Sequence, residues 1–152
     1  MPDECADDRS SMSDSPWNQP STVAGFDFIV AHGIWNLART GREFRQAVRE
    51  AARVARAGCA LFLFTFSRST LPETAAPLPG ESFVFTQFSG QPQCFLTEEQ
   101  LISELAVCGF EPDPLLPVRE LNRPKKGALC SSTAPVIYEA LFRSRRTPVS
   151  SG

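Results

Sequence analysis

Two apolar runs of strand length, separated by one amphipathic segment, constrain the fold of this chain more than any other feature. Residues 59–66 (CALFLFTF) contain a single hydroxyl group, and residues 26–31 (FDFIVA) contain a single charge. Short apolar runs without alternation are typical of strands that are buried on both faces of a parallel sheet. We therefore predict two parallel strands at these positions.

The segment between the two runs has the pattern of a helix. Thr40 and Glu43 have the capping-box spacing, in which each side chain satisfies a free amide of the first turn. Gly58 is expected to end the helix in a left-handed conformation, which predicts a helix over residues 41–57. The expected inner stripe is formed by Phe44, Val48, Ala51 and Ala55.

A strand, a helix and a second strand in this order form a right-handed βαβ unit. In such sheets ligands bind outside the carboxyl ends of the strands. This rule singles out residues 31–33 after the first strand and residues 66–68 after the second.

The rest of the chain completes an α/β domain. Residues 67–96 form a long insert with an aromatic run at 83–88, and a second helix is expected to begin at Thr97, which has Gln100 at the capping-box spacing. Prolines in residues 111–121 confine any strand there to a sheet edge. A last strand is expected over 135–143. We predict a loose acidic leader at 1–24, one domain at 25–143 and a disordered tail at 144–152.

The composition limits the expected partners. The 152 residues suit one domain, and 15 basic against 17 acidic side chains give a net charge of −2, so no positive field favours a nucleic acid or an anionic membrane. No apolar run reaches the roughly 18 residues of a membrane span, and the acidic leader does not have the basic start of a targeting peptide. The 5 cysteines are scattered and odd in number, which indicates reduced thiols and a cytoplasmic protein.

Several chemistries are disfavoured by missing motifs. The glycines are too widely spaced for a dinucleotide fingerprint or a phosphate loop. With 1 histidine and no Cys-x-x-Cys pair, the sequence predicts no metal site. A hydrolase is also disfavoured, because no GxSxG elbow is present.

The segment that follows the first strand offers a mixed set of side chains. His32, Trp35 and Asn36 would place an imidazole, a flat apolar wall and an amide at the mouth of the sheet, which is the mixture that small-molecule pockets use. Taken alone, His32 is better explained by a histidine that bonds a nearby carbonyl, and the functional interpretation rests on the cluster of the three side chains. We expect His32 and Asn36 to face the ligand cleft and not the core.

The succession of these segments resembles the second half of a class I S-adenosylmethionine-dependent methyltransferase. The residues that carry the resemblance are FDFIVAHG at 26–33, AARVARAG at 51–58, FTFS at 64–67, FLTEEQL at 95–101 and CGF at 108–110. The resemblance implies a partial Rossmann-like fold with a mainly parallel sheet and a C-terminal antiparallel hairpin. It also implies S-adenosylmethionine as cofactor and methyl transfer to a small molecule.

The first three strands of that fold, with their glycine-rich motif, have no counterpart in this chain. Residues 11–17 (SMSDSPW) are similar to the family's segment after the third strand, with Ser11 where an adenine-contacting Asp is expected. The resemblance therefore assigns cofactor contacts to Ser11, Met12, Ala31, His32 and Gly33. We expect this chain alone to bind S-adenosylmethionine weakly or not at all, and to be weakly active or inactive.

Methyl transfer requires little from side chains, because the sulfonium is already activated and the protein aligns the acceptor and excludes water. If the acceptor must lose a proton, His32 is the candidate base, because histidine titrates near neutral pH. The expected substrate wall consists of Trp35, Asn36, Phe66, Arg68 and Phe85. For Arg68, a solvated surface position is an equally good interpretation.

Two further readings follow from the missing strands. The chain could be a non-catalytic remnant or an interaction module that uses its half-sheet to bind a protein. In the resembled fold, the far side of strand 26–31 pairs with a strand that this chain does not encode. We therefore expect an open apolar edge accompanied by an apolar patch. The chain is expected to form a homodimer or to aggregate through that edge, unless residues 1–24 fold back over it.

Overall fold

The computed structural model describes residues 25–123 and 134–145. Its elements, in chain order, are β1 (Phe26–His32), η2 (Trp35–Leu37), α2 (Gly41–Val54), β2 (Ala55–Phe66), η3 (Arg68–Thr70), β3 (Val84–Phe85), β4 (Gln93–Cys94), α3 (Glu98–Val107), β5 (Phe110–Pro112), β6 (Arg119–Leu121) and β7 (Ile137–Ser144). No helix among these residues is long and apolar enough to span a bilayer.

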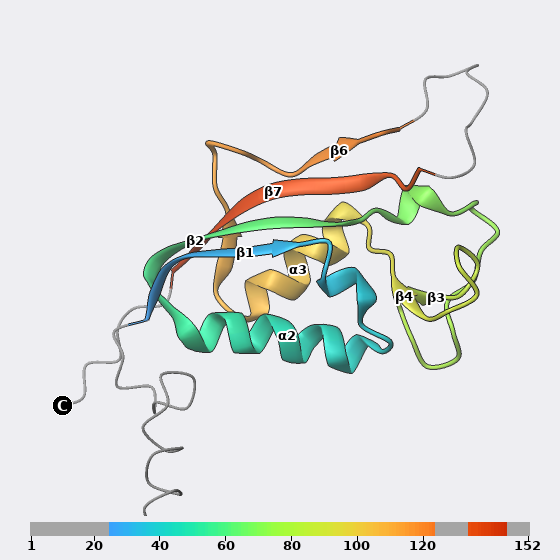
Figure 1. Cartoon of the computed structure of the whole chain (residues 1–152), viewed down its shortest axis with the longest axis horizontal. Coiled ribbons are helices and arrows are strands. Elements are labelled where there is room, and N and C mark those ends of the chain that lie inside the picture. Colours follow the sequence, from blue (N-terminus) through green and yellow to red (C-terminus); the bar gives the residue numbers. More distant parts are fainter. Residues whose placement is uncertain (1–24, 124–133, 146–152) are drawn as a thin grey trace, which may run out of the picture.

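The main sheet has the order β1-β2-β7-β5, and β6 also pairs with β7 (Figure 1). β1 and β2 are parallel, whereas β7 is antiparallel to β2, β5 and β6. Consequently β1, β2, β5 and β6 run in one direction and β7 alone runs against them. The expected α/β class with antiparallel pairing at the C-terminal end is confirmed. The described sheet is mixed and not mainly parallel, because one of its four strand pairings is parallel and three are antiparallel.

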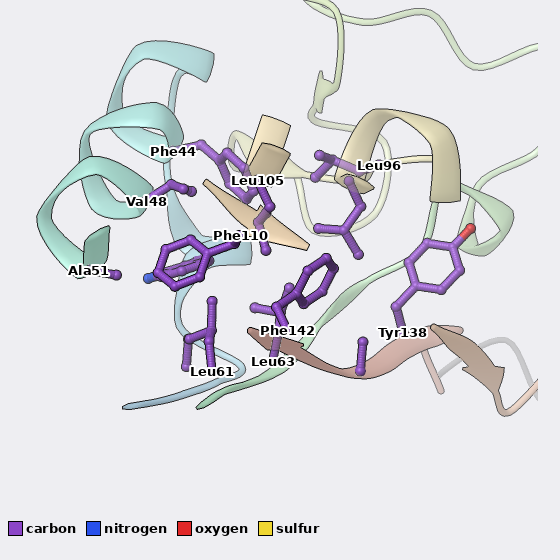
Figure 2. Packing of buried hydrophobic residues seen from close by; sticks show 14 of the residues in the cluster. Phe44, Val48, Ala51, Leu61, Leu63, Leu96, Leu105, Phe110, Tyr138 and Phe142 are labelled. Carbon is purple, nitrogen blue, oxygen red and sulfur yellow. The ribbon is translucent and has the colours of Figure 1, made fainter. Parts of the chain in front are cut away.

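Both helices pack against one face of this sheet. The side chains of Leu61 and Leu63 on β2 are fully buried, in one cluster with Phe44 of α2 and Leu105 of α3 (Figure 2). Because side chains alternate along a strand, every second residue of β2 enters this core. Phe142 of β7 extends the cluster across the sheet.

The second face carries the alternate side chains of β1, β2 and β7, and we call it the open face. The strand registers place on it Phe28, Val30, His32, Ala60, Phe62, Phe64, Glu139, Leu141 and Arg143. Phe28 is 58% exposed and Val30 is 55% exposed. The expectation that strand 26–31 is buried on both faces is therefore wrong, because both helices of the described residues lie on the opposite side of the sheet.

The open edge and the apolar patch that the sequence predicts are both present. Within the described residues, β1 pairs only with β2 and is the first strand of the sheet. Gly33 N–H donates to the carbonyl of Phe64 at 2.9 Å. Because alternate residues of a parallel strand bond to opposite neighbours, the backbone groups of Phe28, Val30 and His32 point away from β2, along the free edge.

The first helix ends earlier than the sequence predicts. α2 stops at Val54, and Ala55 has the extended backbone (φ −77°, ψ 132°) that begins β2. Gly58 has the expected positive φ of 78°, but it lies inside β2, where it accompanies a register irregularity between β1 and β2. The local helix signal of residues 55–57 therefore yields to strand pairing with Phe26.

The other element predictions agree more closely. Thr97 and Gln100 form a complete capping box at the start of α3, whereas at α2 Thr40 caps Glu43 N–H and Glu43 reaches Arg39 N–H. The edge strands β5 and β6 lie within the proline-containing segment, and β7 continues through Ser144, one residue into the expected tail. The leader and residues 146–152 lie outside the described residues.

One acidic side chain connects the C-terminal strands. The Asp113 carboxylate accepts bonds from Leu115 N–H at 2.8 Å and from the Arg143 guanidinium at 2.9 Å, and Arg143 also donates to the carbonyl of Gly58. The bond from Leu115, followed by the contact with Arg143, lowers the pKa of Asp113 below its usual value of 3.8.

We predict that this carboxylate contributes to acid denaturation. Because its pKa is lower in the folded chain, its stabilisation is complete above the pKa of the unfolded chain and is lost as the pH falls through the folded value. Urea unfolding between pH 2 and pH 6 should show a shallower acid dependence for Asp113→Asn than for the unaltered chain. Glu50→Gln, at an exposed pair with Arg53, is the matched control. Equal slopes for the two variants would contradict the prediction.

Candidate functional site

The carboxyl ends of β1 and β2 lie side by side at one edge of the sheet, because the two strands are parallel. His32 is the register partner of Phe64, and Gly33 follows with a φ of 66°. η2, η3 and the β3–β4 insert gather at the same end of the molecule (Figure 1). The structure therefore brings residues 31–33 and 66–68 to a common edge, as the βαβ rule predicts.

His32 lies on the solvent side of this edge. Its ring is stacked on Phe64, with the ring centroids 4.3 Å apart and the planes 19° from parallel, and Phe62 lies at 6.5 Å. The side chain is exposed, so the imidazole is accessible to a ligand. Its expected role as a base stays a prediction.

Trp35 and Asn36 occupy a different position from the one expected. η2 turns toward the helix side of the sheet, where the Trp35 ring meets Phe44 edge-on at 6.1 Å. Asn36 is only 2% exposed, so the expectation that it faces an open cleft is wrong. Its Oδ1 has no hydrogen-bond partner in the described residues. An unpaired buried carbonyl costs about 1–3 kcal/mol, and this oxygen remains available as an acceptor.

Arg68 organises the beginning of the insert. Its guanidinium donates to the carbonyls of Leu71, Pro72, Glu73 and Ala75 at 3.1–3.4 Å. It also lies 4.9 Å from the ring centre of Phe85. Most of the guanidinium donors therefore hold the chain that follows, so a solvated surface position does not describe this residue. Its place in a substrate wall stays a prediction.

An aromatic cluster docks the insert on the end of β2. Phe66 is half-buried and meets Phe88 and Phe95, with centroid distances of 5.7 and 5.4 Å. Phe85 is 3% exposed and meets Phe95 edge-on. Phe85 is therefore a core residue of the insert and does not present an open face to a substrate.

A polar cluster at the same end was not identified from the sequence. The Ser67 hydroxyl donates to the Glu120 carboxylate and accepts a bond from Ser69 N–H. Burial raises the pKa of Tyr138, and a hydrogen bond with Ser67 opposes that shift. The position of Ser67 directly after a strand was the only local signal, because Glu120 and Tyr138 reach the site from distant strands.

A cavity of about 400 Å³ lies beside this cluster, within the range of small-molecule pockets. Its lining mixes hydroxyl groups, charges and one apolar side chain: Arg68, Ser69, Leu71, Glu73, Thr97 and Tyr138. Figure 2 shows Tyr138 with its hydroxyl directed away from the hydrophobic cluster. The arrangement can hold a small ligand that has hydrogen-bonding groups.

Two of the expected cofactor contacts, Ser11 and Met12, lie outside the described residues. Among the residues that are described, no group of three His, Cys, Asp or Glu side chains is placed to hold a metal ion.

Cys59, Cys94 and Cys108 are free thiols. Burial raises the pKa of Cys94 to about 12, so this thiol is protonated and unreactive at neutral pH.

We predict that Arg68→Lys loosens the insert, because an ammonium group cannot bond several carbonyls in the fork geometry of a guanidinium. Hydrogen exchange should become faster at Ala75 and Leu78, whose amides bond within this segment. Arg53→Lys, at an exposed helix pair, is the matched control and should leave these rates unchanged. Unchanged exchange in Arg68→Lys would show that the insert is held by its aromatic cluster alone.

The chain matches no protein-family model and no curated protein sequence. Solved structures do match it. An S-adenosylmethionine-dependent methyltransferase from Methanosarcina mazei has a TM-score of 0.53 at 19% identity, and the match covers 90% of this chain and 74% of that one.

Two further methyltransferase structures agree with this match. The 1,6-didemethyltoxoflavin-N1-methyltransferase of Burkholderia thailandensis has a TM-score of 0.54 at 15% identity, covering 85% of this chain and 50% of that one. A methyltransferase of Mesorhizobium loti has a TM-score of 0.52 at 10% identity, covering 79% and 62%. The fold is therefore a partial class I methyltransferase-like fold, and the matched part spans between half and three quarters of those chains.

Proposed function

We propose that this chain contributes one half of an S-adenosylmethionine-dependent methyltransferase site that acts on a small molecule. The observation that carries the proposal is the edge at which β1 and β2 end together, within a fold shared with several such enzymes. The structure of the 1,6-didemethyltoxoflavin-N1-methyltransferase contains bound S-adenosylhomocysteine and 1,6-didemethyltoxoflavin, which supports this cofactor and a small-molecule substrate. The net charge of −2 also favours a small acceptor over a nucleic acid.

The residues at this edge fit one side of the cofactor. The left-handed Gly33 turns the chain without a side chain, so the backbone of Ala31–Gly33 can approach a ligand closely. When bound, S-adenosylmethionine supplies an activated methyl group. The described residues include no glycine-rich turn after a strand, so the chain supplies a partial site, in which Ala31, His32 and Gly33 form one wall.

The acceptor is proposed to occupy the cavity beside η3. The hydroxyls of Tyr138 and Ser69 can orient a polar acceptor there, and the Arg68-held insert keeps water away from one side. His32, the base expected from the sequence, lies on the open face and does not line this cavity, so it is not proposed as the base for an acceptor held here. We place the protein in the cytoplasm, in agreement with its three described free thiols.

A second candidate function is a non-catalytic interaction module. The exposed Phe28 and Val30 on the open face favour it. The structure of the [4+2]-cyclase SpnF also matches, with a TM-score of 0.53 at 15% identity. The same fold therefore occurs in a protein named for a reaction other than methyl transfer, and fold alone does not decide the activity.

We predict that the isolated chain binds S-adenosylmethionine only weakly. A site with one wall leaves most polar groups of the ligand without partners, and each missing bond lowers the affinity. Calorimetric titration should give a dissociation constant weaker than about 100 μM, which corresponds to roughly 5.5 kcal/mol. A constant in the low micromolar range would mean that the chain forms a complete site.

The position of the weak site can be tested with matched glycine variants. Titration with millimolar S-adenosylhomocysteine should shift the NMR amide signals of Ala31, His32 and Gly33. Gly33→Ala should abolish these shifts, whereas Gly58→Ala should retain them. Both glycines have positive φ, so the left-handed backbone strains both variants by about 1 kcal/mol. An added Cβ makes ordinary contact with the Phe64 ring at 3.7 Å at position 33 and meets nothing within 4 Å at position 58. Unshifted signals at 31–33 in the unaltered chain would overturn the proposed function.

A further inference from the structure

The open face is an apolar surface of regular layout. The strand registers arrange its side chains in three rows across β1, β2 and β7. The middle row is Val30, Phe62 and Leu141. One outer row is Phe28, Ala60 and Arg143, and the other is His32, Phe64 and Glu139.

This surface is comparable in size to the largest apolar patches of monomeric proteins. A Phe side chain contributes about 150–250 Å² when it is fully buried, so Phe28 alone, at 58% exposure, leaves on the order of 100 Å² in water. Val30 is 55% exposed, and the half-buried Phe62 and Phe64 extend the patch. Together these residues approach the 300–600 Å² of the largest patches on monomers and form a substantial part of the about 800 Å² that each partner of a stable complex buries.

No segment of this chain outside the described residues has the composition to cover the patch. Residues 1–24 are rich in Asp, Ser and Pro, residues 124–133 carry two lysines, and residues 146–152 contain a single large apolar side chain. None has the repeated apolar positions of a strand or helix that packs on a sheet. The sequences of these three segments therefore predict no cover for the patch.

We propose that the open face is a self-association surface on which a second copy of this chain packs face to face. The proposed twofold axis lies between the two sheets and runs along the middle row, perpendicular to the strands. It places β7 antiparallel over β7 of the second copy. Glu139, which pairs with Arg119 of its own chain, then lies over Arg143 of the second copy, which pairs with its own Asp113. The two ion pairs meet with opposite charges facing at one side of the interface.

The same rotation matches the remaining rows in size and chemistry. Phe64, a large side chain, lies over Ala60 of the second copy, a small one. His32 lies over Phe28 of the second copy, which adds an aromatic contact. The middle row meets itself across the axis, as an isologous interface requires, and the sheets pack about 10 Å apart as in a β-sandwich.

Pairing along the free edge of β1 is the alternative mode, and the sequence alone favours it. Edge pairing would satisfy the outward backbone groups of Phe28, Val30 and His32. It would leave Phe62 and Phe64 in water, because these residues lie one strand further in. Packing of the open faces covers both strands, and we therefore favour it over edge pairing.

The test is the molar mass of the full chain, measured by light scattering at micromolar concentrations. We expect a dimer. Phe62→Glu places two carboxylates against each other at the axis and leaves the edge of β1 unchanged. It should raise the dimer dissociation constant at least about 30-fold, the effect of a central interface residue. Val107→Glu, at an 85% exposed position on α3, is the matched control and should remain a dimer.

Circular dichroism melts establish that each variant is folded. If Phe62→Glu does not fold, Val30→Glu replaces it, because this middle-row position is already exposed in the single chain. A monomer for the unaltered chain would overturn the proposal. A dimer that persists in the folded axis variant would also overturn it and would indicate edge pairing instead. The mass measurement is made without cofactor, so it tests self-association separately from binding at residues 31–33, although packing of the open faces would cover the His32 side chain.

Discussion

The pairing of β2 with both β1 and β7 is the constraint on which the rest of the structure depends. β2 is parallel to β1 on one side and antiparallel to β7 on the other, over most of its length. Its Leu61 and Leu63 are fully buried beneath the helices, and its Phe62 and Phe64 form the centre of the open face. One strand therefore supplies the core, the edge proposed to contact the cofactor and the surface proposed for self-association.

The carboxyl end of β2 is held from several directions, and this explains why the candidate site has a defined shape. Ser67 N–H donates to the carbonyl of Val136, and Arg68 N–H donates to that of Leu96. The Arg68 guanidinium then bonds the carbonyls of the following segment. Backbone and side chain together bring β7, the start of α3 and the insert to one point, where the cavity lies.

The half-sheet is compatible with both proposed functions for one physical reason. A parallel strand at the edge of a sheet has a free row of backbone groups and, when only one helix layer is present, an uncovered face. The same strand, β1, ends in the turn proposed to contact the cofactor. Burial of the open face would therefore order the strand that carries His32 and Gly33, which links association to the shape of the site.

The sequence by itself determined the order of elements, the direction of the first two strands and the position of the ligand edge. Hydrophobic periodicity, the caps at Thr40 and Thr97 and the topology rules for βαβ units are local or general enough to be seen in one chain. Only the tertiary structure decided which faces are buried. Phe28 and Phe85 both lie in short apolar runs of the sequence. In the structure Phe28 is exposed to water, whereas Phe85 is buried in a core. The roles of Asn36, Arg68, Glu120 and Tyr138 likewise depend on partners that are distant in sequence, and no local pattern encodes which distant segments will meet.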